Sequence, residues 1–196
     1  EKFCIWYYGR SADFPAGLAP ALGTGSIAMM TSDDGLDWTL YDGPLKGGAV
    51  MVADENPKAF DSVHVGTGDI EFRDGLWHHW YYGGDTGTPD SANPTYAFPG
   101  YNLHAGLAVS EDGIHWQRKP GKAFGGALVG LDGEIYGAFP NTYQVGNRTY
   151  LQVTIKDKDF IGWVSRVWAS EDLETWTYLG PQTWSDDPRY YDSNGM

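Results

Sequence analysis

Carboxylates are the side chains of this chain that offer the most chemistry. The 196 residues include 26 Asp and Glu against 13 Lys and Arg, which gives a formal charge of −13. Two aspartates stand in matching settings, Asp61 in "FDSVHVG" and Asp192 in "YYDSNGM". Carboxylates gathered at one site can act as general acids, bases or nucleophiles, whereas isolated aspartates mostly shape turns. The negative charge repels phosphate backbones, which argues against a nucleic-acid partner and leaves neutral sugars and cations compatible.

Histidine and cysteine offer little metal chemistry. His78 and His79 are adjacent on an expected strand, so their side chains point to opposite faces and cannot chelate an ion together. The one cysteine, Cys4, excludes an internal disulfide and a cysteine-based zinc site. Its apolar setting "FCIWYY" predicts a buried structural thiol. We therefore predict no cofactor from these residues.

Two long segments without periodicity, 10–25 and 83–102, are rich in Gly, Pro and aromatic residues. Loops of this length in a compact domain are often functional. In the second segment Tyr96, Phe98 and Tyr101 can stack on a sugar ring or on a protein partner, or merely cover the edge of a sheet. Two such loops on one face predict a rim around a binding site or a docking surface.

A motif of eight residues occurs three times, and it indicates which secondary structure positions these groups. Its copies are "TSDDGLDW" (31–38), "VSEDGIHW" (109–116) and "ASEDLETW" (169–176). The Ser and Asp side chains can bond turn N–H groups, and Gly35 and Gly113 can supply a positive φ. Leu173 replaces the glycine in the third copy, which predicts a slightly different turn there. Each copy of the motif predicts the turn of a β-hairpin, with its Trp packed back across the strands.

A second repeat precedes each hairpin. It comprises "DGLWHHWYYGGD" (74–85), "NRTYLQVTIKD" (147–157) and the end of a third copy, "EKFCIWYYGR" (1–10). The full unit is four antiparallel strands at a period of about 50 to 80 residues, which is typical of a β-propeller blade.

Counting these units predicts a single all-β domain over residues 1–196, a β-propeller with only part of its ring present. The blade segments are 1–44 with the last three strands of one blade, 61–121, 134–181, and the start of a further blade at 190–196. We therefore expect a truncated chain, or an open arrangement that another chain completes.

With these motifs aligned, the sequence resembles the five-bladed propeller glycosidases, the group of arabinanases, β-xylosidases, invertases and levansucrases. The resemblance rests on "FCIWYYGR", "GLAVSEDGIHWQRKPG" and "DGLWHHWYYGG". It implies a chemistry in which one carboxylic acid protonates the leaving oxygen and a second carboxylate activates water or attacks the sugar. In that group these carboxylates come from the innermost strands of successive blades, at one mouth of the central tunnel. The resemblance implies no cofactor beyond a single structural cation, which some relatives hold with a histidine.

The resemblance assigns the candidate catalytic carboxylates. Asp61 matches the Asp at the start of an inner strand, and Asp192 repeats it in the next partial blade. The third blade should carry a Glu in a phrase like Glu-Ala-Pro, but that position falls on Ala138 in "YGAFPNTYQV", which leaves Glu134 as a displaced acid. The candidate substrate-binding residues are His64, Asp69, Tyr96, Tyr101, His104, Asn141 and Arg166.

The departure at Ala138 keeps three functions open. The first is a glycoside-hydrolase-like propeller that binds or hydrolyses carbohydrate through inner-strand carboxylates. The second is a catalytically inactive propeller that serves as an interaction subunit of a larger complex with a protein partner, such as an organellar complex. The third is a non-catalytic carbohydrate-binding module. No run approaches the roughly 20 apolar residues of a membrane span, and a chain that begins at Glu1 suits an exported or organelle-targeted protein, whether secreted, periplasmic or plastid.

Overall fold

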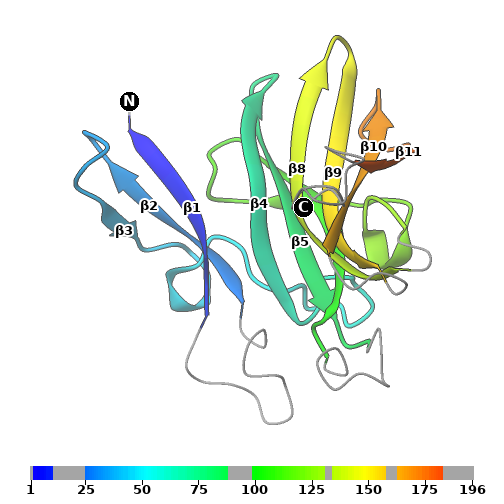
Figure 1. The fold of residues 1–196 in the computed structure, drawn as a ribbon. Helices are drawn as coiled ribbons and strands as arrows, with labels where there is room; N and C mark the ends of the chain where they lie inside the picture. The colour runs from blue at the N-terminus through cyan, green and yellow to red at the C-terminus, as the bar shows by residue number, and fades with distance from the viewer. Residues whose placement is uncertain (1, 11–24, 88–98, 131–133, 158–162, 183–196) are drawn as a thin grey trace, which may run out of the picture.

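Three antiparallel sheets make up the part of the chain that this computed structural model describes, residues 2–10, 25–87, 99–130, 134–157 and 163–182 (Figure 1). The first sheet has the order β1-β2-β3, the second β4-β5-β6-β7 and the third β8-β9-β10-β11. The strands are β1 (Phe3–Gly9), β2 (Ser26–Ser32), β3 (Thr39–Tyr41), β4 (His64–Arg73), β5 (Leu76–Asp85), β6 (Asn102–Ser110), β7 (Gln117–Lys119), β8 (Glu134–Val145), β9 (Arg148–Asp157), β10 (Trp163–Ser170) and β11 (Thr177–Gln182).

The sheets confirm the predicted fold class. Each four-stranded sheet runs from its first strand at one edge to its last strand at the other, as in a propeller blade. The first sheet starts at the position of a second strand, so β1 has no described neighbour on the side where β4 and β8 stand in the other sheets. The described helices are two three-residue turns, Lys46–Gly48 and Phe124–Gly126. In the described ranges no helix is long and apolar enough to cross a membrane.

The three copies of the eight-residue motif form three nearly identical turns. In the first, Ser32 Oγ accepts a hydrogen bond from the Gly35 N–H at 2.8 Å, while Asp34 Oδ1 accepts from the N–H groups of residues 36 and 37. The same bonds recur around Ser110 and Ser170. The expectation of a different third turn is wrong: Leu173 takes the glycine conformation, with φ of 61° against 77° at Gly35. The surrounding side-chain bonds hold this strained backbone in place.

Tryptophans lock neighbouring sheets together. Trp6 of the first sheet reaches the turn of the second, where its indole Nε1–H donates to the Gly113 carbonyl at 2.8 Å. A Cβ at Gly113 would lie 2.8 Å from the Trp6 ring, so only glycine fits beneath it. Trp80, at the matching place in the second sheet, packs edge-on against Trp176 of the third. Apolar residues from facing sheets fill the two spaces between them.

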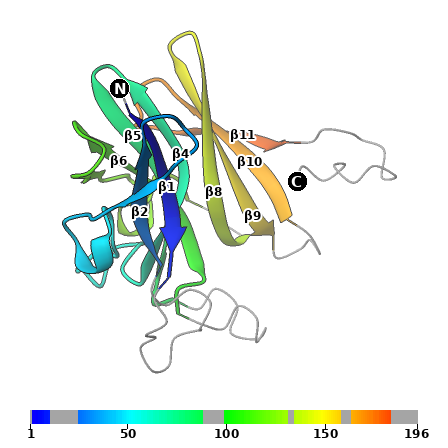
Figure 2. The same ribbon diagram turned by 90° about the vertical axis from the view of Figure 1, so that its left-hand side faces the viewer.

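The inner strand β4 lies between β1 and β8 (Figures 1 and 2). One end of the sheets carries the end of β1, the start of β4 and the end of β5, and we call it the loop end; the opposite end carries the three turns and is called the hairpin end. Cys4 corrects another expectation, because its thiol is free and exposed rather than buried. The reason is the open edge of β1, where a fourth strand would otherwise cover it.

Candidate functional site

Two bulges meet where the inner strands β4 and β8 run side by side. The pairing of β4 with β5 shifts between Thr67 and Ile70, and the pairing of β8 with β9 shifts between Ala138 and Asn141. A Cβ on Gly68 of the first bulge would lie 2.5 Å from the Pro140 carbonyl oxygen of the second. The bulges are therefore in contact. Bulges on inner strands re-aim side chains and are frequent beside functional sites.

Asp69 is the carboxylate that this junction presents. Its Oδ2 accepts hydrogen bonds from the backbone N–H of Thr142 at 3.2 Å and from the Thr142 hydroxyl at 3.0 Å. The side chain is only half-buried, so the carboxylate is fixed in position and still reachable from solvent. Asn141, the next residue of the second bulge region, is exposed, and its amide donates to the Phe139 carbonyl at 3.1 Å.

Phe139 adds an aromatic surface held in a strained backbone. Its φ of 53° lies in the left-handed region, which bulky residues rarely adopt. Such a conformation costs on the order of 1–3 kcal/mol and persists where the surroundings fix it, often at functional sites. The ring packs edge-on against Tyr82 with centroids 5.2 Å apart, yet half of Phe139 remains exposed. An exposed ring and a fixed carboxylate on two touching bulges are suitable groups for binding a sugar.

Two tyrosines border this junction at the loop end. Tyr8 of β1 and Tyr82 of β5 occupy the same place in the repeated sequence Trp-Tyr-Tyr-Gly. Their rings lie so close to the backbone at Gly25 and Gly66 that a Cβ on these glycines would come within 2.4 and 2.2 Å of a ring atom. Burial raises the pKa of Tyr82 to about 12, and because the residue is 7% exposed, its ring serves mainly as the surface on which Phe139 packs.

The predicted substrate-binding histidines are placed as neutral groups near the loop end. His64 is fully buried, and its Nε2 lies 2.8 Å from the Gly100 carbonyl. His104 lies between the rings of Phe124 and Phe60, with centroids 5.7 and 6.5 Å away. Burial lowers the pKa of both histidines. Among the described residues, no group of three or more His, Cys, Asp or Glu side chains could hold a metal ion.

Asp61 lies apart from this junction, in the space between the first and second sheets. Its side chain is 1% exposed, and its Oδ2 accepts from the Tyr81 hydroxyl at 2.9 Å and the Arg118 Nε–H at 2.7 Å. Arg118 also lies 3.4 Å from a carboxylate oxygen of Asp54, beside a cavity of about 150 Å³. The Oδ1 of Asp61 is buried without a hydrogen-bond partner, but because Oδ2 is held in an ion pair and the side chain is shielded from solvent, we interpret Asp61 as a structural group.

Of the remaining predicted residues, only Tyr101 lies near the junction among those that the structure describes. Glu134 begins β8, where it pairs with Asp157. Tyr101 is half-buried and packs on the cluster formed by Tyr82, Leu103 and Ala138. Arg166 lies in β10, where its Nη1 donates to the Tyr178 hydroxyl at 2.6 Å. Asp192 and Tyr96 lie outside the described residues.

The structure thus brings together three of the predicted residues, Asp69, Asn141 and Tyr101, and adds two that sequence reasoning missed, Phe139 and Thr142. A shared position in the sequence links Asp69 with Asn141, which Thr142 directly follows. Asp69 stands five residues before the turn at Asp74, and Asn141 stands five before the turn at Gly146. Counting back from each turn marks the same point on both inner strands.

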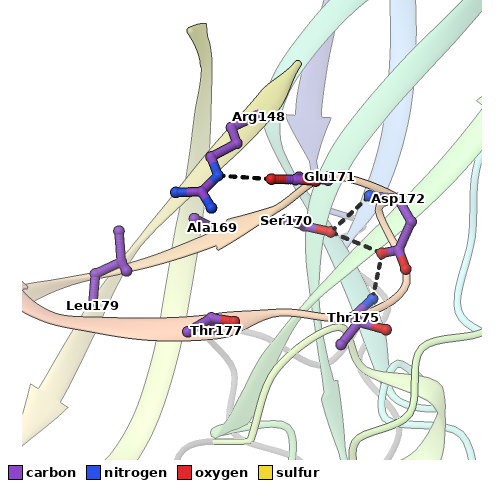
Figure 3. Close-up of a pocket in the computed structure, with 8 residues that line it drawn as sticks. All are labelled: Arg148, Ala169, Ser170, Glu171, Asp172, Thr175, Thr177 and Leu179. Atoms are coloured by element: carbon purple, nitrogen blue, oxygen red, sulfur yellow. Dashed lines mark hydrogen bonds and ion pairs between the residues drawn. The ribbon is translucent and has the colours of Figure 1, made fainter. Parts of the chain in front are cut away.

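The groove shown in Figure 3 belongs to the blade repeat and is not a second site. It encloses about 260 Å³ at the hairpin end of the third sheet, between Arg148, Glu171 and Thr175. Its polar groups bind one another, as in the 3.0 Å contact of the Arg148 Nε with Glu171. A groove of about 410 Å³ occupies the matching place in the second sheet, around Asp112 and His115. Its recurrence therefore follows from the shape of the hairpin.

Comparison with known proteins agrees with this architecture. No protein-family model and no curated sequence matches the chain. Among solved structures, the chain is similar to a sucrose-6-phosphate hydrolase from Lactobacillus gasseri, with a TM-score of 0.66 and 15% identity over 95% of this chain and 33% of that chain. It is similar to a GH32 beta-fructofuranosidase from Bombyx mori, with a TM-score of 0.63 and 15% identity over 92% of this chain and 32% of that chain. It is also similar to a family 117 glycoside hydrolase from Zobellia galactanivorans, with a TM-score of 0.62 and 14% identity over 94% of this chain and 54% of that chain.

The class of protein is therefore defined by its fold: this chain is part of a β-propeller of the kind found in glycoside hydrolases. The predicted resemblance is confirmed at that level. The chain spans about a third of the length of the first two relatives.

Proposed function

We propose that this chain binds carbohydrate at the junction of β4 and β8, as part of a glycoside-hydrolase-like propeller. The observation that carries the proposal is the contact between the two bulges, which brings the bulge with the fixed carboxylate of Asp69 to the bulge with the exposed ring of Phe139. A carboxylate held on one oxygen can accept hydroxyl hydrogen bonds from a sugar with its remaining lone pairs. The aromatic ring offers an apolar surface to the C–H face of the same sugar.

Binding is better supported than hydrolysis by the described residues. Hydrolysis of a glycoside normally needs two carboxyl groups that flank one bond. At the junction, Asp69 is the one described carboxylate, because β8 offers the amide of Asn141 and the buried methyl of Ala138. A catalytic role for the other candidate acids, Glu134 and Asp192, is a proposal that rests on the sequence alone. We propose a structural role for Asp61.

The experiment is titration calorimetry of the chain with arabino-, xylo- and fructo-oligosaccharides. Asp69→Asn removes the charge, and because hydrogen bonds to charged groups contribute about 1.5–3 kcal/mol, affinity should fall about 10- to 100-fold. The matched control is Asp74→Asn, at an exposed turn residue of the same strand pair. Phe139→Ala should weaken binding several-fold, whereas Phe72→Ala, which truncates an exposed phenylalanine at the hairpin end of β4, should leave binding unchanged. Equal losses in the variants and their controls would contradict the proposed site.

A second candidate function, an interaction subunit of a larger assembly, is favoured by the outward face of the first sheet. Phe3, Ile5 and Leu40 are 55%, 39% and 69% exposed, and Ile5 and Leu40 flank Met30 across the sheet. Exposed apolar sheet faces and open edges mark places where other elements pack. Light scattering on the purified protein tests this function, and a monomer that co-purifies with no partner would count against it.

A further inference from the structure

Arg10 follows the last residue of β1 and is supported by an aromatic ring. Its guanidinium carbon lies 5.1 Å from the centre of the Tyr8 ring, and its Nε–H donates to the Tyr8 hydroxyl at 3.1 Å. The side chain is exposed. With the Nε–H engaged by Tyr8, the two terminal nitrogens of the guanidinium form the edge that faces outward to a ligand.

This setting differs from that of other arginines in this acidic chain. Arg73, Arg118 and Arg148 each have a carboxylate oxygen within 4 Å, at 3.6 Å for the pair with Glu71 and 3.0 Å for the pair with Glu171. In the ranges that the structure describes, no carboxylate lies within that distance of Arg10. This local positive charge, held on a tyrosine, can receive an acid from a ligand although the chain as a whole is acidic.

Arg10 also borders the proposed carbohydrate site. Tyr8 and Tyr82 occupy the same place in the repeated sequence at the loop end, and the Tyr82 ring packs edge-on against the Phe139 ring. The Gly25 carbonyl, at the residue on which the Tyr8 ring packs, accepts the backbone N–H of Val65 at 3.1 Å, and the Tyr82 ring packs on Gly66, the next residue. Burial lowers the pKa of His64 and Arg10 lowers it further, while at Tyr82 Arg10 acts against the rise in pKa that burial causes. A sugar chain bound at the junction and extended toward the loop end would therefore pass this guanidinium.

We infer that Arg10 binds the carboxylate of an acidic sugar, so that the site prefers oligosaccharides that contain hexuronate. The inference rests on the proposed carbohydrate-binding function and specifies its substrate class. A planar guanidinium matches a carboxylate with two parallel hydrogen bonds. One carboxylate balances one arginine, whereas a phosphate monoester carries about −1.5 to −2 charges at pH 7 and calls for more cations.

The test compares a hexuronate tetrasaccharide with the same tetrasaccharide after reduction of its carboxyl groups to neutral hexose. Titration calorimetry should give at least tenfold tighter binding of the acidic form. Arg10→Gln should lower affinity for the acidic form about 10- to 100-fold and leave the neutral form unchanged, because it removes a charge-assisted pair. Arg10→Lys should recover part of the loss, since lysine keeps the charge without the fork. The matched control is Arg148→Gln, an arginine at the hairpin end paired with Glu171.

Each outcome discriminates. Equal losses for acidic and neutral sugars in Arg10→Gln would overturn the inference, because Arg10 would then only support Tyr8. A preference for a sulfated neutral tetrasaccharide over the hexuronate would overturn the assignment to a carboxylate. Binding of the neutral form without any acidic preference would overturn the inference and leave the proposed function intact. Absence of binding to either form would refute the proposed function, and the inference with it.

Discussion

Gly113 provides a direct test of how the first two sheets are held together. The residue has φ of 74°, its carbonyl accepts the Trp6 indole hydrogen bond at 2.8 Å, and a Cβ there would lie 2.8 Å from the indole. Gly35 is its counterpart in the first sheet, with φ of 77° and its nearest side-chain atom 3.8 Å from a Cβ, in the ring of Phe3. Substitution of either glycine by alanine strains the backbone equally, but only one substitution disturbs a contact between sheets.

The expected magnitudes follow from that difference. A left-handed conformation costs an alanine about 1–2 kcal/mol, and the loss of chain entropy in the unfolded state returns about 0.4–1 kcal/mol. Gly35→Ala should therefore lower the free energy of unfolding by about 1 kcal/mol. Gly113→Ala adds a lost hydrogen bond of about 0.5–1.5 kcal/mol and an overpacked contact of about 1–3 kcal/mol. Its total cost should be about 3–5 kcal/mol.

Urea unfolding followed by tryptophan fluorescence and near-ultraviolet circular dichroism measures both costs. A double-mutant cycle with Trp6→Ala separates the strain from the contact, because in that background Gly113→Ala should cost no more than Gly35→Ala. If the two alanine variants lose the same free energy of unfolding in the wild-type background, the contact of Trp6 with Gly113 does not stabilise the packing of the sheets, and the reasoning fails.

Two further perturbations follow from buried groups. Asp61→Asn should lower the free energy of unfolding by about 1–3 kcal/mol, since Arg118 then loses its 2.7 Å partner and keeps only the more exposed carboxylate of Asp54 at 3.4 Å. Thermal unfolding at pH 7 measures this loss, and a melting temperature equal to that of the wild type would contradict the structural role. His79 is buried with its Nε2 3.0 Å from the Thr67 hydroxyl, and burial lowers its pKa from 6.5 to about 3. Because the unfolded chain binds the proton first, stability is complete above pH 6.5 and falls as the pH decreases toward 3. His79→Gln should flatten that decline by up to about 1.4 kcal/mol per pH unit, and an unchanged slope between pH 6 and 4 in urea titrations would refute the assignment.

The architecture was predictable because its determinants are local. Each recurring turn depends on bonds between a Ser or Asp side chain and N–H groups two or three residues away, so eight residues of sequence specify it. The same bonds explain why the expectation for Leu173 failed. The turn was expected to change with the loss of glycine, yet Ser170 and Asp172 hold it in the same shape around a leucine at φ of 61°.

The candidate site was less accessible because it depends on partners far apart in the chain. The ion pair of Asp61 depends on Arg118, 57 residues away, whereas the sequence showed only an aspartate expected at the start of a strand. The bulges arise from the pairing of β4 with β5 and of β8 with β9, so no local sequence motif predicts them. The strained conformation of Phe139 has no signature in its own sequence, since it results from that pairing.

The two inner strands nevertheless share one register, and this gives the site its logic. Five residues before the turn, β4 carries a carboxylate and β8 an amide, Asp69 and Asn141. A carboxylate only accepts hydrogen bonds, whereas an amide both donates and accepts. Between them lies Thr142, whose hydroxyl and backbone N–H keep one carboxylate oxygen in place. Such a set suits the hydroxyl groups of a sugar, which also donate and accept, and it lacks the second carboxyl group that cleavage of the glycosidic bond requires. We therefore propose recognition as the role of the described junction, and the second carboxyl group for cleavage would have to come from residues beyond it.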